Sequence, residues 1–315
     1  MTGAHGCIGA WVVKALLERG DVAVAFDLAG DPRRLRLLLE DAQLASVRFI
    51  HGDVTDAAAV LRALEASGAR HVIHLAGLQV PVCKAEPLLG ARVNVLGTLH
   101  VLEAARQLGC ERVVYASSAA VFGRGVDGRP VAEDEPAEAS THYGVFKRAN
   151  EGNARVYWLD HGLNSVGLRP LTVYGVGRDF GLTSGPTKAM KAAVLGRPYC
   201  IRFSGSTDFL YAADAAAAFL AAADRAPDGA SVFNVHGDTA AVADVVGLIR
   251  EQAPGADIRF SGPELPIPAE LDGRALDSAL GPLHRTPLSA GVRETMDRFT
   301  RLRDAARLDS ADLDT

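Results

Sequence analysis

The sequence has few cysteines and no long apolar run. Its four cysteines show no close pairing, so we expect reduced thiols rather than a disulfide framework. No apolar run approaches the roughly 20 residues that a membrane helix needs, and no signal peptide opens the chain. Basic residues form no run, and the formal net charge is −5. These features predict a cytoplasmic protein that binds neither nucleic acid nor a membrane.

What is present is the composition of an ordinary globular protein. Hydrophobic residues make up 48% of the 315 positions and charged residues 23%, which allows one large α/β domain and a smaller one. His71 and His74 stand three apart on a predicted strand and therefore face opposite sides of it. We expect no metal site at this pair.

The chain opens with three glycines spaced three residues apart: Gly3, Gly6 and Gly9. An apolar stretch, Trp11 to Leu17, predicts a helix directly after them. Glycine lets the backbone approach a pyrophosphate, which then rests on the unpaired N–H groups of the helix N-terminus. Residues 22–26 predict a buried parallel strand that ends at Asp27. An acid at this distance from the loop binds the adenosine ribose hydroxyls, which favours NAD over NADP.

A dinucleotide-binding fold also needs a strand that leads into the glycine loop at the centre of the sheet. Only Met1 precedes Thr2 here. We therefore expect a misassigned start or a truncated chain, with a strand of roughly five to seven residues missing. The sequence predicts a gap or an irregular edge beside the strand at 22–26.

Two further predicted strands, 47–54 and 72–77, end in residues that suit a cofactor site. Asp53 is placed to bond adenine, or it is a loop or cap residue before the helix predicted at 57–66. The second strand ends in small residues that let the backbone approach a cofactor. The spacing alone does not decide between the two interpretations of Asp53.

A fourth strand, 112–118, closes on Ser117 and Ser118. Parallel strands place ligand sites at their carboxyl ends, so a serine here suits a substrate hydroxyl, although a turn-forming serine pair is the simpler reading. The helix predicted at 86–108 is apolar over much of its surface, which indicates burial on two sides. Within it, Asn94 either contacts the cofactor or bonds backbone.

Tyr143 and Lys147 lie four residues apart in a predicted helix at 141–160. That spacing places them one turn apart on the same face. An ammonium this close to a phenol favours the phenolate and lowers the tyrosine pKa. A tyrosine tuned in this way acts as a general base on an alcohol.

The second half of the chain predicts strands at 165–175 and 231–235. It also predicts helices at 209–223, 239–253, 274–280 and 288–307. We expect a cofactor domain over residues 1–174 that also receives about 208–236. The substrate-binding domain is then made of 175–207 and 237–315.

The glycine loop, Asp27, Ser118 and Tyr143-x-x-x-Lys147 occur in this order, and the chain resembles the extended short-chain dehydrogenase/reductase family in its NAD-dependent epimerase/dehydratase branch. Further stretches look like family motifs: Gly52-Asp53-Val54, His74-Leu75-Ala76-Gly77, Ser117 to Gly123 and Arg169 to Gly175. The resemblance implies a Rossmann-type doubly wound parallel sheet with a smaller C-terminal α+β domain. It also implies NAD as cofactor, a carbohydrate-like small-molecule substrate and a homodimer through helices 86–108 and 141–160.

The resemblance assigns roles to individual positions. Tyr143 is the catalytic base or acid, Ser118 the catalytic serine, and Lys147 the partner that bonds the nicotinamide ribose. The expected cofactor contacts are Gly3, Gly6, Cys7, Ile8, Gly9, Asp27, Asp53, Val54, Leu75, Ala76, Gly77, Asn94, Tyr143, Lys147 and Pro170. The expected substrate contacts are Gln79, Ser117, Thr172 and Arg178.

Departures from the family pattern narrow the reaction. Ala119-Ala120 stand where the dehydratases have an acid pair, so dehydration is not expected. Thr207 stands where nucleotide-sugar epimerases have the arginine that neutralises the substrate diphosphate, a role that threonine cannot fill. Arg178, Arg197 and Arg202 are possible substitutes, and the spacing favours none of them.

The leading hypothesis is hydride transfer to NAD from a secondary alcohol, with Tyr143 taking the proton. A sugar, sugar acid or polyol is slightly favoured as substrate, and a nucleotide-sugar 4-epimerase is the alternative. An inactive NAD-binding regulatory protein is the alternative from another class.

Overall fold

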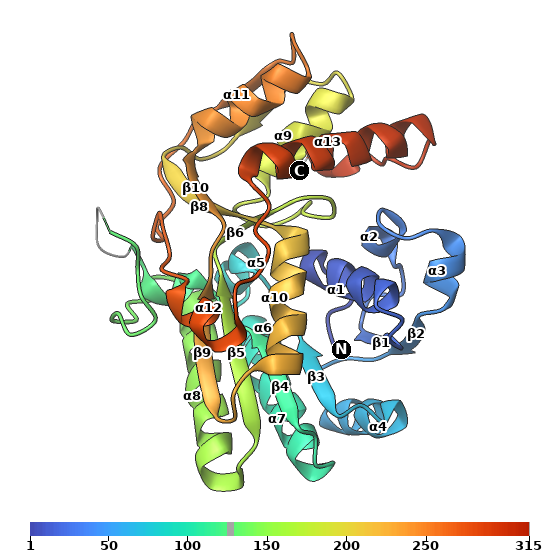
Figure 1. The fold of residues 1–315 in the computed structure, drawn as a ribbon, viewed down its shortest axis with the longest axis vertical. Coiled ribbons are helices and arrows are strands. Elements are labelled where there is room, and N and C mark those ends of the chain that lie inside the picture. The colour runs from blue at the N-terminus through green and yellow to red at the C-terminus, as the bar shows by residue number, and fades with distance from the viewer. Residues whose placement is uncertain (125–128, 315) are drawn as a thin grey trace.

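The computed structural model describes residues 1–124 and 129–314. Part of the loop predicted between Gly123 and Ser140 therefore lies outside the described residues. A parallel sheet of four strands forms the centre of the fold (Figure 1). Its order is β3 (His71–His74), β4 (Arg112–Ala116), β5 (Asn164–Pro170) and β9 (Ala230–Val235). A parallel pair, β1 (Val24–Asp27) and β2 (Arg48–His51), continues it beyond β3.

Helices cover both faces of this sheet, as the doubly wound prediction requires. One face carries α1 (Cys7–Glu18) and α10 (Ala212–Arg225), and the other carries α4 (Ala57–Ser67), α7 (Gly97–Gln107) and α8 (His142–His161). Successive strand residues enter opposite cores, because side chains alternate along a strand. Val114 packs with Val12 and Phe219 under the first pair of helices. Val113 and Tyr115 belong to the core under the second set. The fold class predicted from the sequence is confirmed.

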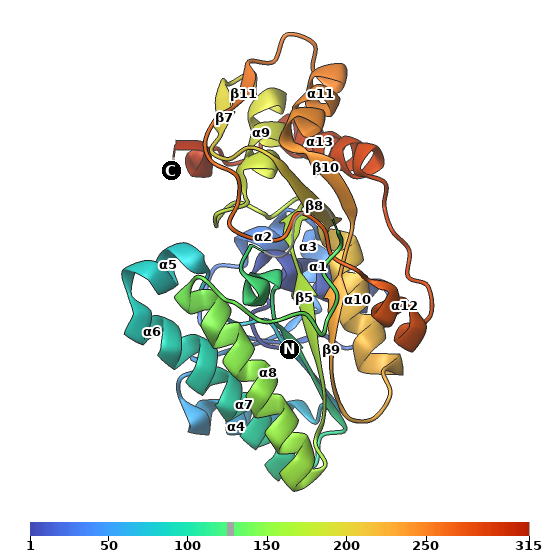
Figure 2. The ribbon, with the colours of Figure 1, turned by 90° about the vertical axis from the view of Figure 1, so that its left-hand side faces the viewer.

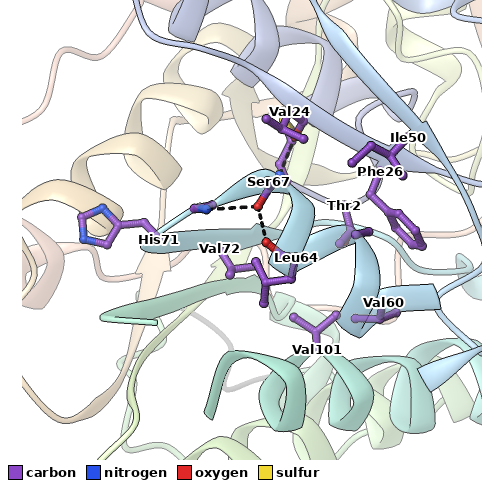
Figure 3. Close-up of a pocket in the computed structure, with 13 residues that line it drawn as sticks. Thr2, Val24, Phe26, Ile50, Val60, Leu64, Ser67, His71, Val72 and Val101 are labelled. Atoms are coloured by element: carbon purple, nitrogen blue, oxygen red, sulfur yellow. Dashed lines mark hydrogen bonds between the residues drawn. The ribbon is translucent and has the colours of Figure 1, made fainter. Parts of the chain in front are cut away.

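The place between β1 and β3 holds an isolated bridge rather than a full strand. Only Met1 and Thr2 lie between β1 and β3, where the Thr2 amide donates to Ile73 O at 2.9 Å and the Phe26 amide donates to Met1 O at 2.8 Å. Thr2 lines a mainly apolar pocket, whose volume is about 40 Å³. Figure 3 shows the residues around it. Its wall includes Val24, Ile50, Val60, Val72 and Val101. Two residues thus join β1 to β3, with a small cavity beside them.

The long helix predicted at 86–108 is continuous but irregular. It consists of α6 (Pro87–Ala91), a π turn (Arg92–Leu96) and α7. Asn94 is fully buried at the middle of the π turn. Such a widened turn redirects a side chain within an otherwise regular helix, and π turns occur often at functional sites.

A second group of elements gathers at one end of the sheet, at the top of Figure 1. Its strands are β6 (Thr172–Tyr174), β8 (Ser206–Tyr211) and β10 (Asp238–Ala241), with the pair β7 (Tyr199–Ile201) and β11 (Ile258–Phe260). Its helices are α9 (Gly185–Val194), α11 (Val242–Gln252) and α13 (Leu288–Asp304). Met190, Ile249 and Phe299 help to form its core. The short α12 (Arg274–Leu280) packs beside β9 instead.

The remaining short elements lie in connections. They are α2 (Arg33–Arg36), α3 (Asp41–Ala45), α5 (Val80–Ala85) and the 3₁₀ turns Ala119–Phe122 and Ala311–Asp314. No helix in the described part of the chain is both long and apolar enough to cross a membrane.

Two predicted helices begin later than expected. The helix predicted from Phe209 begins at Ala212, because Phe209 to Tyr211 belong to β8, which pairs with β6 on one side and β10 on the other. The helix predicted from residue 239 begins at Val242, after β10. Both strands depend on partners that are distant in the sequence, and local alanine-rich composition concealed them.

Asp208 provides a test of the packing of β8. It is fully buried; its Oδ1 accepts a hydrogen bond from the Gly237 amide at 2.8 Å, and its Oδ2 has no partner among the described residues. Burial raises its pKa from 3.8 to about 7. Between these pH values the unfolded chain releases the proton while the folded protein keeps it. The free energy of unfolding therefore falls as pH rises, by at most about 4 kcal/mol at roughly 1.4 kcal/mol per pH unit.

We predict that Asp208→Asn flattens this dependence and stabilises the protein near pH 8, because the amide keeps the acceptor for Gly237 and cannot ionise. Denaturant unfolding between pH 4 and pH 8 measures the effect. The exposed Asp297→Asn is the control and should retain the slope of the unchanged protein. An equally steep slope in Asp208→Asn would contradict the prediction.

Candidate active site

A cleft of about 210 Å³ lies at the carboxyl ends of the parallel strands, beside the second group of elements. It brings together most of the residues singled out in the sequence. Those that line it are Gly3, Gly6, Cys7, Ile8, Gly9, Leu75, Gly77, Gln79, Ser117, Ser118, Tyr143, Lys147, Pro170 and Arg178. The position agrees with the rule that doubly wound sheets bind ligands where their strands end.

The glycine loop is packed too closely for any side chain. Gly3 has φ +70°, and a Cβ there would lie 2.4 Å from the Ala76 nitrogen. A Cβ on Gly9 would lie 2.1 Å from the carbonyl oxygen of Gly3. Helix α1 begins at Cys7 without a side-chain cap, so the first N–H groups of the helix are available to an anion. This bare, tightly folded cradle suits the pyrophosphate of a dinucleotide.

Tyr143, Ser118 and Lys147 meet at the floor of the cleft. Thr141 caps α8 by accepting a hydrogen bond from the Gly144 amide at 3.1 Å, which fixes the turn that presents Tyr143. The Ser118 side chain lies beside the Tyr143 hydroxyl and acts to lower the tyrosine pKa. Lys147 Nζ lies 5.5 Å from the centroid of the tyrosine ring. The three groups that the sequence placed on two separate segments are therefore neighbours.

The pKa of Tyr143 is raised, whereas the sequence predicted that Lys147 would lower it. Burial raises its pKa, while Ser118 and Arg178 act in the opposite direction. Lys147 donates to the carbonyl oxygen of Ala116 at 2.7 Å rather than to the phenol, and burial lowers the pKa of its ammonium to about 8. Tyr143 and Lys147 do lie one turn apart on α8, but their spacing does not reveal which oxygen accepts the hydrogen bond of Lys147.

Ser117 belongs to a buried ion-pair network. Its hydroxyl donates to Glu151 Oε1 at 2.6 Å, and Arg169 holds both oxygens of the same carboxylate at 2.7 and 2.8 Å. Arg148 adds a contact to Glu151 Oε2 at 2.9 Å. Ser117 also lines the cleft, and its expected contact with the substrate stays a prediction. Glu151, one turn beyond Lys147 on α8, was missed, because nothing in the sequence indicates its pairing with Arg169.

Asn94 bonds backbone and does not line the cleft. Its Oδ1 accepts from the Leu78 amide at 2.7 Å, and its Nδ2 donates to the Leu78 carbonyl oxygen at 2.9 Å. The second of its two sequence interpretations is therefore the one observed. Asn94 holds the segment that carries Gly77 and Gln79 in place.

The acid predicted for the adenosine ribose lies in a second cavity. Asp27 lines a space of about 190 Å³ beside the glycine loop. Its two oxygens accept hydrogen bonds from the His5 amide at 2.9 Å and the Ala29 amide at 3.0 Å. The carboxylate is therefore held in place by backbone at the end of β1.

Other predicted contacts lie elsewhere. Asp53 accepts a hydrogen bond from the Thr55 amide at 2.8 Å, as a turn residue does, and neither it nor Val54 lines the two cavities. Ala76 packs under Gly3. Thr172 is fully buried and its hydroxyl bonds that of Thr207 at 2.8 Å, so the expected substrate contact by Thr172 is corrected.

Arg178 is the one of the three candidate arginines that lines the cleft. Its guanidinium donates to Thr183 Oγ1 at 3.0 Å and to Gln79 Oε1 at 3.4 Å, and its buried Nε has no partner among the described residues. The adjacent Asp179 is bound by Arg34 at 2.5 Å. The hydrogen bonds of Arg178 thus go to neutral groups.

Comparison with known proteins decides the family. The profile of the NAD dependent epimerase/dehydratase family matches residues 1–235. The chain belongs to this family. The resemblance found in the sequence is therefore confirmed, and the protein is an NAD-dependent enzyme. The glycine cradle described above fits that cofactor.

Named relatives carry related activities. The UDP-glucose 4-epimerase of Azospirillum brasilense is 31% identical over 271 residues, which cover 80% of this chain and 76% of that protein. The 3 beta-hydroxysteroid dehydrogenase type 7 of Mus musculus is 36% identical over 205 residues, covering 57% and 52%. The solved structure of Thermus thermophilus UDP-glucose 4-epimerase with NAD has a TM-score of 0.83 at 27% identity and covers 95% of this chain and 97% of its own.

Proposed function

We propose that this enzyme acts on a secondary alcohol of a carbohydrate-like substrate: a sugar, a sugar acid or a polyol. The observation that supports this most strongly is that Tyr143, Ser118 and Lys147 meet inside the cleft that the glycine loop borders. Residues 175–207 and 237–315 would form the substrate-binding domain, and 1–174 with about 208–236 the cofactor domain.

In this proposal Tyr143, Ser118 and Lys147 each have a separate role in the cleft. Tyr143 exchanges a proton with the substrate oxygen, as base or as acid, and Ser118 orients that oxygen by a hydrogen bond. Lys147 bonds the nicotinamide ribose, one helical turn from the tyrosine. NAD, when bound, would supply the acceptor for the hydride of the substrate carbon. The mainly apolar wall that includes Leu171, Val173, Leu182 and Ile267 limits the access of water.

A nucleotide-sugar 4-epimerase is the second candidate. Relatives of that name support it, as does Arg178, which offers a cation where Thr207 cannot. Guanidinium groups bind phosphate and carboxylate with paired hydrogen bonds, so Arg178 suits either a diphosphate or a sugar acid. The inactive regulatory alternative has lost its support, since the chain belongs to a family of NAD-dependent enzymes.

We also propose a homodimer in the cytoplasm. Helices α7 and α8 lie next to one another on the face shown in Figure 2. Exposed large apolar side chains gather on α8 and on the helix that begins at Pro87: Leu88, Leu96, Val145, Val156 and Leu159. Covering such a surface with a second copy would remove it from water. The four free cysteines agree with a reducing compartment.

Tyr143→Phe should reduce turnover by roughly 10²-fold or more, because the proton acceptor is lost, and should leave NAD affinity within about threefold. Incubation with NAD and a panel of sugars measures it. Net NADH accumulation indicates a dehydrogenase, whereas an isomer without NADH indicates an epimerase. Tyr157→Phe, on the same helix and outside the cleft, is the control. Full activity in Tyr143→Phe would overturn the assignment.

Arg178→Met should reduce kcat/KM for anionic substrates by about ten- to hundredfold relative to neutral sugars, since charge-assisted hydrogen bonds are lost. The steady-state comparison uses glucuronate, UDP-glucose and glucose. The exposed Arg202→Met should behave as the unchanged protein. An equal loss for charged and neutral substrates, or an effect on NAD affinity alone, would count against this role.

Leu159→Arg should yield monomers, because a charge placed in an apolar contact between copies is left unpaired. Sedimentation velocity at micromolar concentration reports the mass. Val22→Arg, also at an exposed apolar position but outside helices α7 and α8, should remain dimeric. A monomeric unchanged protein would refute the proposed dimer.

A further inference from the structure

The cavity beside the glycine loop is lined by a histidine, His5, whose ring nitrogens have no role in the proposed reaction. This space of about 190 Å³ is lined by Asp27, Phe49, His51 and the small residues of the turn after β1. His5 also lines it, from the position between Gly3 and Gly6 in the glycine loop. The cavity therefore adjoins the cradle that suits the pyrophosphate.

The His5 ring is buried without polar partners. Its side chain is 8% exposed, and neither Nδ1 nor Nε2 makes a hydrogen bond within the described residues. A neutral imidazole carries one hydrogen-bond donor and one acceptor. Burying both without hydrogen-bond partners costs free energy. The ring packs edge-on against Phe49, with 5.4 Å between centroids. The apolar contact explains its position but satisfies neither nitrogen.

Backbone hydrogen bonds hold His5 on both sides. Its amide donates to Asp27 Oδ2 at 2.9 Å, and its carbonyl oxygen accepts from Arg34 Nη1 at 2.9 Å. Arg34 is itself anchored on Asp179 at 2.5 Å. The backbone of His5 is thus fixed beside the Asp27 carboxylate, and its imidazole lines the same cavity.

We propose that the His5 imidazole is a specificity-determining contact for the adenosine ribose of NAD. A ribose hydroxyl is both donor and acceptor: it donates to the Asp27 carboxylate and accepts from the imidazole N–H. The two side chains together satisfy a free 2′-hydroxyl. A 2′-phosphate has no proton for Asp27 at neutral pH and meets its negative charge. Asp27 therefore disfavours a 2′-phosphate, and His5 adds a hydrogen bond to the free 2′-hydroxyl.

Isothermal titration with ADP-ribose tests this without any substrate or turnover, so the result is independent of the proposed reaction. His5→Phe keeps an aromatic ring against Phe49 but has no nitrogen. It should bind ADP-ribose about five- to tenfold more weakly, as expected for one lost hydrogen bond. His5→Asn restores a donor and an acceptor and should recover part of the loss. His51→Phe, an exposed ring on the same cavity, is the control.

Removing the ribose hydroxyl sharpens the test. 2′-Deoxy-ADP-ribose should bind the unchanged protein several-fold more weakly than ADP-ribose, and this difference should shrink in His5→Phe. Unchanged ADP-ribose affinity in a folded His5→Phe protein would overturn the proposal. So would an equal penalty for the missing hydroxyl in both proteins. If His5→Phe does not fold, the same comparison is made with His5→Asn and His5→Ala.

Discussion

The close contact between the glycine loop and the strand end at Ala76 is the constraint on which the rest of the site depends. Gly3 lies against the backbone of residues 75 and 76, and Gly9 lies against Gly3, with no room for a side chain at either position. This packing places the N-terminus of α1 at the edge of the sheet. The cleft on one side and the Asp27 cavity on the other are both bounded by that loop.

The proposed catalytic groups reach the same edge from the other half of the sheet. Ser118 follows β4 and Tyr143 opens α8, and the buried network around Glu151 and Arg169 ties that helix to β5. The raised pKa of Tyr143 and the lowered pKa of Lys147 have one cause, burial of both groups in the cleft. A cofactor and a substrate would complete the hydrogen bonding that burial leaves open.

Local spacing was sufficient for much of the site. The three glycines, the tyrosine–lysine pair and the serine at the end of a strand each depend on residues close in sequence, and all of them line the cleft. Local spacing could not predict hydrogen bonds between segments that are distant in the sequence. The Thr172 hydroxyl bonds that of Thr207, and the Ser117 hydroxyl donates to Glu151. Lys147 donates to the carbonyl oxygen of Ala116 and not to the phenol. The fold class, family and cofactor were predicted correctly because several weak motifs occur in one order.

The central claim is that NAD lies along the glycine loop with its nicotinamide beside Tyr143. A crystal structure of the protein with NAD tests it most directly. The account predicts the pyrophosphate on the first N–H groups of α1 and the nicotinamide ring next to the hydroxyls of Tyr143 and Ser118. A dinucleotide bound elsewhere, or a nicotinamide ring remote from Tyr143, would contradict it.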